Sequence, residues 1–140
     1  MPTLRDALNA SASALDAQRV RMEVAVSNLA NAESTRSTGG QPYRRREVVL
    51  ETQSFASALD RDPAAAGVKV AAVLEDQSDF RRRYEPSHPD ADADGFVAVP
   101  NVDVPEEMVD MLGAARAYQA NLTAISLIRD TVQRALELAK

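Results

Sequence analysis

A seven-residue repeat of apolar residues near the N-terminus constrains the fold more than any other feature. Leu8, Leu15, Met22 and Leu29 recur at a strict interval of seven residues. Apolar residues at this interval line one side of an α-helix and favour supercoiled pairing with another helix. The repeat predicts one helix from residue 3 to about residue 31, roughly 40 Å long.

The C-terminal part of the chain carries a longer seam of the same kind. Pro105 suits the first position of a helix, and Glu106 and Glu107 favour its positive end. We therefore expect a second long helix over 103–140. Its predicted seam, in alternating steps of four and three residues, is Met111, Ala115, Tyr118, Leu122, Ile125, Arg129, Val132, Leu136 and Ala139.

The segment between the two helices has a different composition. Ser, Thr, Gly and Pro dominate residues 31–43, which predicts a loop or an extended arm. A helical turn is expected over 54–67. The four runs with β-forming residues are 44–52, 68–74, 80–84 and 96–99.

These patterns together predict a mainly α fold with a small β insertion. The long terminal helices are expected to be paired in a coiled-coil-like manner, with short strands or a hairpin between them. The predicted parts are an N-terminal helix over 1–33, a loop and small β-rich insertion over 34–102, and a C-terminal helix over 103–140.

Composition argues against several classes of function. The 140 residues include no cysteine and a single histidine, so thiolate metal sites and cysteine nucleophiles are excluded. The formal net charge of −5 disfavours nucleic-acid binding. No apolar run is long enough to span a membrane, and no signal peptide is visible. We expect no catalytic residue, no metal and no cofactor, and composition alone favours the cytoplasm.

Two charged motifs have alternative interpretations. The stretch DADADG, Asp90 to Gly95, matches the first positions of a calcium-binding loop, but Asn101 stands where the bidentate Glu should be. We therefore favour a solvated acidic turn. The arginine triplets 44–46 and 81–83 fall in predicted strands, where charges protect an exposed edge. We expect them to contact an acidic neighbouring protein or the chain's own acidic loop.

The two ends of the chain resemble the bacterial flagellar axial proteins of the rod and hook. The N-terminal signature R-M-x-x-x-x-x-N-x-A-N-A is supplied by Arg21, Met22, Asn28, Ala30, Asn31 and Ala32. The segments GGQPYRRR, FRRRYEPSHPDADADGFVAVPNVDV and NVDVPEEMVDMLGAARAYQANLTAI narrow the resemblance to proximal-rod members of that family.

The resemblance implies paired terminal helices that form the wall of a tube, with a β-rich insertion outside. It implies assembly with copies of itself and with other flagellar rod proteins, without direct membrane insertion. It also implies export by the flagellar type III apparatus without a cleaved signal peptide, and a place in the periplasmic rod of the basal body. The cytoplasmic assignment from composition is thereby reversed.

The seams and the signature supply the residues that we expect to bind partners. Because isolated helices are marginal in water, we also expect the terminal segments to be partly disordered before assembly. Polar Tyr118, Gln119 and Asn121 are expected to fix the register of a helical interface. An alternative function is a soluble cytoplasmic coiled-coil adaptor. The expected partner-binding residues are Leu8, Leu15, Met22, Asn28, Leu29, Asn31, Met111, Tyr118, Gln119, Leu122, Ile125, Val132 and Leu136.

Overall fold

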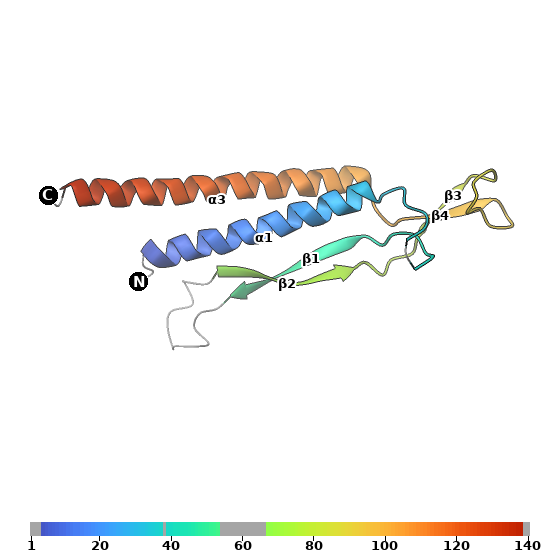
Figure 1. The fold of residues 1–140 in the computed structure, drawn as a ribbon, viewed down its shortest axis with the longest axis horizontal. Coiled ribbons are helices and arrows are strands. Elements are labelled where there is room, and N and C mark those ends of the chain that lie inside the picture. Colours follow the sequence, from blue (N-terminus) through green and yellow to red (C-terminus); the bar gives the residue numbers. More distant parts are fainter. Residues whose placement is uncertain (1–3, 38, 54–66, 139–140) are drawn as a thin grey trace.

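Two long helices lie side by side and run antiparallel in the computed structural model, which describes residues 4–37, 39–53 and 67–138 (Figure 1). Helix α1 spans Leu4–Ala30 and helix α3 spans Val104–Leu138. Both chain ends lie at the same end of the molecule. The predicted fold class, two long terminal helices with a small β insertion, is confirmed.

Polar side chains define the ends of the helices that meet at the opposite end of the molecule. The Asn31 amide donates to the carbonyl of Ser27 at 2.9 Å, just beyond the last turn of α1. At the start of α3, the Asp103 carboxylate accepts from the backbone N–H of Glu106 at 3.2 Å. Asp103 is therefore an N-cap, which satisfies a backbone donor that the helix itself cannot.

The β insertion consists of two separate antiparallel pairs of strands. Strand β1, Arg46–Gln53, pairs with β2, Gly67–Glu75, and the register shifts between Val49 and Leu50. Strand β3, Arg81–Tyr84, pairs with β4, Phe96–Val99. The turn expected over 54–67 lies, apart from its last residue, outside the described residues.

Helix α1 is the middle layer of the elongated part of the molecule. It packs against α3 on one side and against the β1–β2 hairpin on the other (Figure 1). The β3–β4 hairpin projects beyond the helices, at the end where α1 stops and α3 begins. The two hairpins therefore lie in different places relative to the helix pair.

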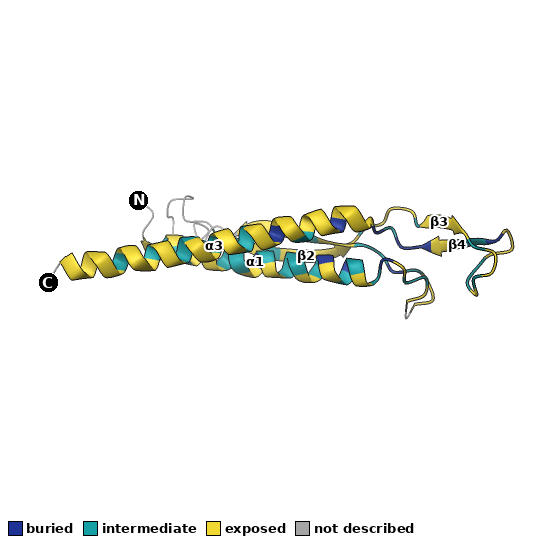
Figure 2. Ribbon diagram, turned by 90° about the horizontal axis from the view of Figure 1, so that it is seen from above, coloured by how far each residue is buried: buried dark blue, intermediate teal, exposed yellow. Residues whose placement is uncertain are grey.

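The core is small and is concentrated near the end where α1 meets the start of α3 (Figure 2). An apolar cluster there consists of Ala32, Tyr43 and Val102. Between the helices the most buried apolar residues are alanines: Ala17 and Ala25 on α1 and Ala114 on α3. Since alanine buries little area, packing between the helices is close but contributes modest hydrophobic stabilisation.

Candidate functional site

A buried polar cluster connects the end of α1, the chain leading into β1 and the first turn of α3. We call it the joint and define it as Asn28, Tyr43, Arg45 and Glu107. Asn28 is 1% exposed and Glu107 is 2% exposed. Buried polar groups are costly unless they are paired, so this cluster requires a complete set of partners.

Asn28 uses the hydrogen-bonding capacity of its amide in full. Its Nδ2 donates to Glu107 Oε2 and to the carbonyl of Arg46, both at 2.9 Å. Its Oδ1 accepts from Tyr43 Oη at 2.9 Å and from the backbone N–H of Arg46 at 3.0 Å. An amide has two donors and two acceptor lone pairs, and all four are occupied. Asn28, at the end of α1, therefore binds the other two segments of the joint at once.

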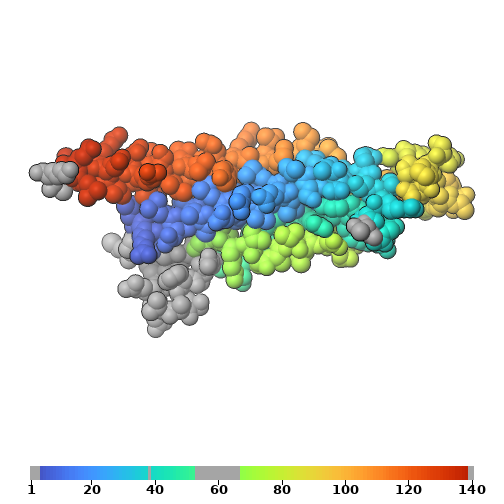
Figure 3. Space-filling view, viewed as in Figure 1, coloured from blue at the N-terminus to red at the C-terminus, as the bar shows by residue number. Residues whose placement is uncertain are grey.

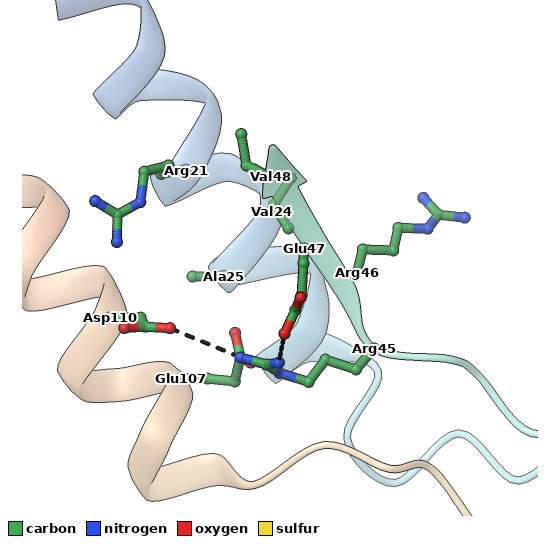
Figure 4. A pocket seen from close by; sticks show the side chains of 9 residues that line it. All are labelled: Arg21, Val24, Ala25, Arg45, Arg46, Glu47, Val48, Glu107 and Asp110. Atoms are coloured by element: carbon green, nitrogen blue, oxygen red, sulfur yellow. Dashed lines mark hydrogen bonds and ion pairs between the residues drawn. The ribbon is translucent and has the colours of Figure 1, made fainter. Parts of the chain in front are cut away.

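Arg45 neutralises the buried carboxylate of Glu107. Its Nε donates to Glu107 Oε1 at 2.5 Å, and it also forms ion pairs with Glu47 and, at 3.7 Å, with Asp110 (Figure 4). Burial opposes the charge of Arg45, but the hydrogen bond to Glu107 and the nearby carboxylates outweigh it and raise its pKa. Arg45 therefore stays positively charged beside Glu107.

A shallow open cleft lies beside the joint, between α1, β1 and α3 (Figure 4). It mixes apolar side chains with charges of both signs. Within the described part of the chain, no group of three or more His, Cys, Asp or Glu side chains is placed to hold a metal ion. The lining residues are Arg21, Val24, Ala25, Arg45, Arg46, Glu47, Val48, Glu107 and Asp110.

The acidic motif forms a turn whose carboxylates bind separate partners. Asp92 Oδ1 accepts from the backbone N–H groups of Asp94 and Phe96, at 3.0 and 2.8 Å. These bonds, the one from Phe96 above all, lower the pKa of Asp92, and the neighbouring Arg82 guanidinium adds to the shift. Asp90 instead pairs with Arg36 at 2.7 Å. The oxygens do not converge on a common point.

The arginine triplets bind within the chain. The expected contact with the acidic loop is confirmed for Arg82, which forms an ion pair with Asp92 at 2.7 Å. Arg44 and Arg45 lie before β1 rather than inside it. Arg44 lies over the Phe80 ring, 4.3 Å from its centroid. The use of Arg45 to bind the first turn of α3 was not predicted.

The structure divides the predicted seam of α3 into two sets. Met111, Tyr118, Ile125 and Val132 are half-buried, whereas Ala115, Leu122, Arg129 and Leu136 are exposed. As the seam of this helix pair, the first three residues of the second set are wrong by one residue, since the positions before them are buried or half-buried: Ala114, Asn121 and Ile128. At Leu136 both it and the preceding Ala135 are exposed, and Ala139 lies outside the described residues.

Small residues explain this error on both helices. On α1 the heptad residues Leu8, Leu15, Met22 and Leu29 are only half-buried, and the deepest positions are Ala17, Ala25 and Asn28. Alanine allows close approach of two helix backbones, but it contributes little to an apolar pattern. One sequence signal could have located the joint. A polar Asn, an Arg triplet and two adjacent Glu residues each fall at the end or the start of a predicted helix or strand.

The polar residues expected to fix register or to bind partners differ in their surroundings. Asn121 Nδ2 donates to the carbonyl of Ala117 in its own helix at 2.9 Å. Gln119 is exposed and Tyr118 is half-buried. Asn31 bonds at the end of α1. Whether these side chains bind partners stays a prediction.

Helix α3 leaves much of its apolar surface uncovered. No described helix is apolar enough over a sufficient length to cross a membrane. Large exposed apolar surfaces mark sites of contact with proteins, membranes or ligands. The exposed large apolar residues of α3 are Val104, Met108, Val109, Leu112, Leu122, Leu127, Leu136 and Leu138.

The chain matches known proteins along nearly its whole length. Residues 8–36 match a family described as flagella basal body rod protein, and residues 93–138 match the C-terminal family of flagellar basal body rod FlgEFG proteins. It is 46% identical to the flagellar basal-body rod protein FlgC of Bacillus subtilis, over 95% of this chain and 96% of the relative.

Other FlgC proteins show the same similarity. Identity is 45% with the protein from Salmonella typhimurium, over 91% of this chain and 92% of the relative. Identity is 40% with that from Agrobacterium fabrum, over 100% of this chain and 98% of the relative. The chain therefore belongs to the FlgC family of flagellar basal-body rod proteins.

Proposed function

We propose that this chain is a structural subunit of the proximal flagellar rod and that it assembles there into a helical tube. Its partners are copies of itself and other rod proteins. Family membership supports a structural role in the basal body. The single observation that carries the assembly mechanism is the apolar surface of α3 that α1 leaves exposed.

The exposed surface of α3 lies beside the seam that packs on α1. Leu122 is 40% exposed and Leu112 is 52% exposed, and burying such side chains between subunits is favourable at about 25 cal/mol per Å². A contact between different surfaces of neighbouring subunits repeats without closing when the rotation does not close a ring. Such contacts build a helical tube.

The C-terminal end of α3 extends past the start of α1 (Figures 1 and 3). Counted from the contact between Asn28 and Glu107, about seven residues of α3, or roughly 10 Å, lie beyond Leu4. Leu136 and Leu138 in this extension are 63% and 90% exposed. The extension supplies an end surface for the next subunit along the rod.

The two halves of the helix pair differ in what holds them. The half near the joint contains the buried polar network and most of the buried alanines. The other half ends in exposed apolar residues, so its order before assembly depends on marginal helix stability. A partly unfolded terminus suits export through the type III apparatus without a cleaved signal peptide. Neither a catalytic role nor membrane insertion is part of this proposal.

Complementation of a strain that lacks its own copy of the protein tests the proposal. The parent chain should restore motility and co-purify with basal bodies. Leu122→Asp should abolish both, because a charge at this position would be buried without a partner in the tube. Gln77→Asp, an equal charge change on the exposed loop before β3, should behave like the parent.

A soluble adaptor would give a different pattern in the same experiment. The parent chain would stay in the soluble fraction and would be absent from purified basal bodies. That result would refute the structural role.

A further inference from the structure

We propose that Glu107, through its contacts with Asn28 and Arg45, fixes the axial register of α3 against α1. The inference concerns the single chain and goes beyond the rod function proposed above. In this view the seam holds the two helices together, whereas the joint selects one alignment among several. Glu107 is thus a positioning residue.

The seam on α1 discriminates poorly between alignments. Ala10, Ala14 and Ala17 lie on the same side of α1 as Asn28, at helical spacing, and all are half-buried or buried. A row of methyl groups presents a smooth surface to the opposite helix. Arg21, half-buried, is on the same side between Ala17 and Asn28. Translation of α3 along the part formed by Ala10, Ala14 and Ala17 therefore changes the contacts of α1 very little.

The seam on α3 repeats after seven residues. A translation by one heptad replaces each of Met111, Tyr118 and Ile125 by another apolar residue of the same seam. The half-buried Asn121 adds no constraint from α1, since its amide donates to the carbonyl of Ala117 within α3. At these three half-buried positions a slip of one heptad therefore replaces one apolar contact by another.

The joint removes this ambiguity. A slip by one heptad would put Ala114 opposite Asn28, and the Nδ2 that donates to Glu107 at 2.9 Å would lose its acceptor. The same slip would separate Glu107 Oε1 from Arg45 Nε, which are 2.5 Å apart in the native alignment. A buried polar residue at a helix interface selects register in this way, since only one alignment satisfies it.

Two consequences follow for the shape of the subunit. The register determines how far α3 extends beyond Leu4. Asn28 also binds the backbone of Arg46, and these bonds fix where β1 starts along α1. Glu107 thus determines the axial position of the end of α3, and Asn28 connects that alignment to the β insertion.

A distance measurement on the free full-length chain tests the proposal. The sequence has no cysteine, so spin labels can be placed at Glu23→Cys on α1 and Ser126→Cys on α3, both exposed sites. Double electron–electron resonance should give a single narrow distribution of distances between the two labels in the parent chain. Glu107→Ala should add a second population, displaced by about 10 Å, which is the length of one heptad. Circular dichroism should show the helix content little changed.

Two further variants control the interpretation. Glu107→Gln keeps the shape of the side chain and an acceptor for Asn28, but it turns an NH2 group toward Arg45, so it should populate the second distance less than Glu107→Ala does. Lys69→Ala removes an exposed ion pair with Glu51 and should retain the single distance.

A single native distance in Glu107→Ala would overturn the proposal, because the seam would then set the register. A broad distribution in the parent would also overturn it. So would loss of the helices in Glu107→Ala, since the proposal requires packing to hold the pair together. None of these results would bear on rod incorporation, which the complementation test measures separately.

Discussion

Asn28 of α1 donates a hydrogen bond to Glu107 of α3 across 79 residues of sequence, and both side chains are almost completely buried. This contact joins the end of one terminal helix to the beginning of the other. It lies at the end of the molecule where the β insertion leaves and rejoins the helices. The most polar part of the interior is therefore also the point where the parts of the subunit meet.

Asn28→Ala should destabilise the free chain by about 1–3 kcal/mol. The substitution removes one hydrogen bond from the Tyr43 hydroxyl and one from the Glu107 carboxylate, and it removes both bonds that Asn28 makes to the Arg46 backbone. Loss of buried hydrogen bonds carries costs of this size. Urea unfolding followed by circular dichroism measures the change. Asn9→Ala, the same substitution at an exposed position of α1, should leave the midpoint almost unchanged. Equal midpoints for the two variants would contradict the role of the joint.

Arg45→Ala should cost about 3 kcal/mol, the lower end of the range for breaking a buried ion pair. Glu107 is 2% exposed and would keep only Asn28 as a partner. Lys69→Ala, which removes an exposed ion pair, should change stability by less than about 1 kcal/mol. The comparison uses the same unfolding measurement. If Arg45→Ala lost no more stability than Lys69→Ala, Arg45 would not be neutralising a buried charge.

Gly95→Ala should destabilise the β3–β4 hairpin by about 1–2 kcal/mol. Gly95 has a φ of +81°, and a Cβ there would lie 3.0 Å from Tyr84 Cε2. Gly39→Ala is the matched control, since a Cβ at Gly39 meets nothing within 4 Å among the described residues. Backbone amide chemical shifts of residues 81–99 should move in the first variant only. An unperturbed hairpin in Gly95→Ala would refute the need for glycine.

Lowering the pH should destabilise the two turns in which the carboxylates of Asp76 and Asp92 accept hydrogen bonds from the backbone. The pKa of Asp76 is lowered, and the main cause is the hydrogen bond from the backbone N–H of Ser78. The pKa of Asp92 is also lowered, and the main cause is the hydrogen bond from the backbone N–H of Phe96. A lowered native pKa contributes stability above the unfolded value of about 4, and the contribution is lost as pH falls through the native pKa. Carboxyl titration by NMR should therefore find both groups below the ordinary range. Titration at or above pH 4 would contradict these turn contacts.

The fold class was predictable from sequence because helix length and a seven-residue period are strong local signals. The heptad of Leu8 to Leu29 and the capping residues around Asp103 locate the two helices well. The side of each helix that faces the other was less predictable. Close packing of Ala17, Ala25 and Ala114 decides it, and alanine is a weak marker in any apolar count.

The joint could not be predicted from local patterns because its members are distant in sequence. The resemblance to axial proteins includes Asn28 but does not say what it binds, and Glu107 was interpreted as a favourable charge at a helix start. Only the folded chain brings Asn28 and Arg45 to the two oxygens of Glu107. A buried ion pair depends on tertiary contact, whereas a helix dipole effect depends on position alone.

Thiol labelling of a single cysteine at Leu122 tests most directly whether assembly buries the exposed side of α3. The parent chain has no cysteine, so Leu122→Cys is a unique reporter, and its reactivity can be compared in the free chain and in purified basal bodies. We expect rapid labelling in the free chain and at least about tenfold slower labelling in basal bodies that contain the variant. Equal labelling rates in the two states would contradict the account.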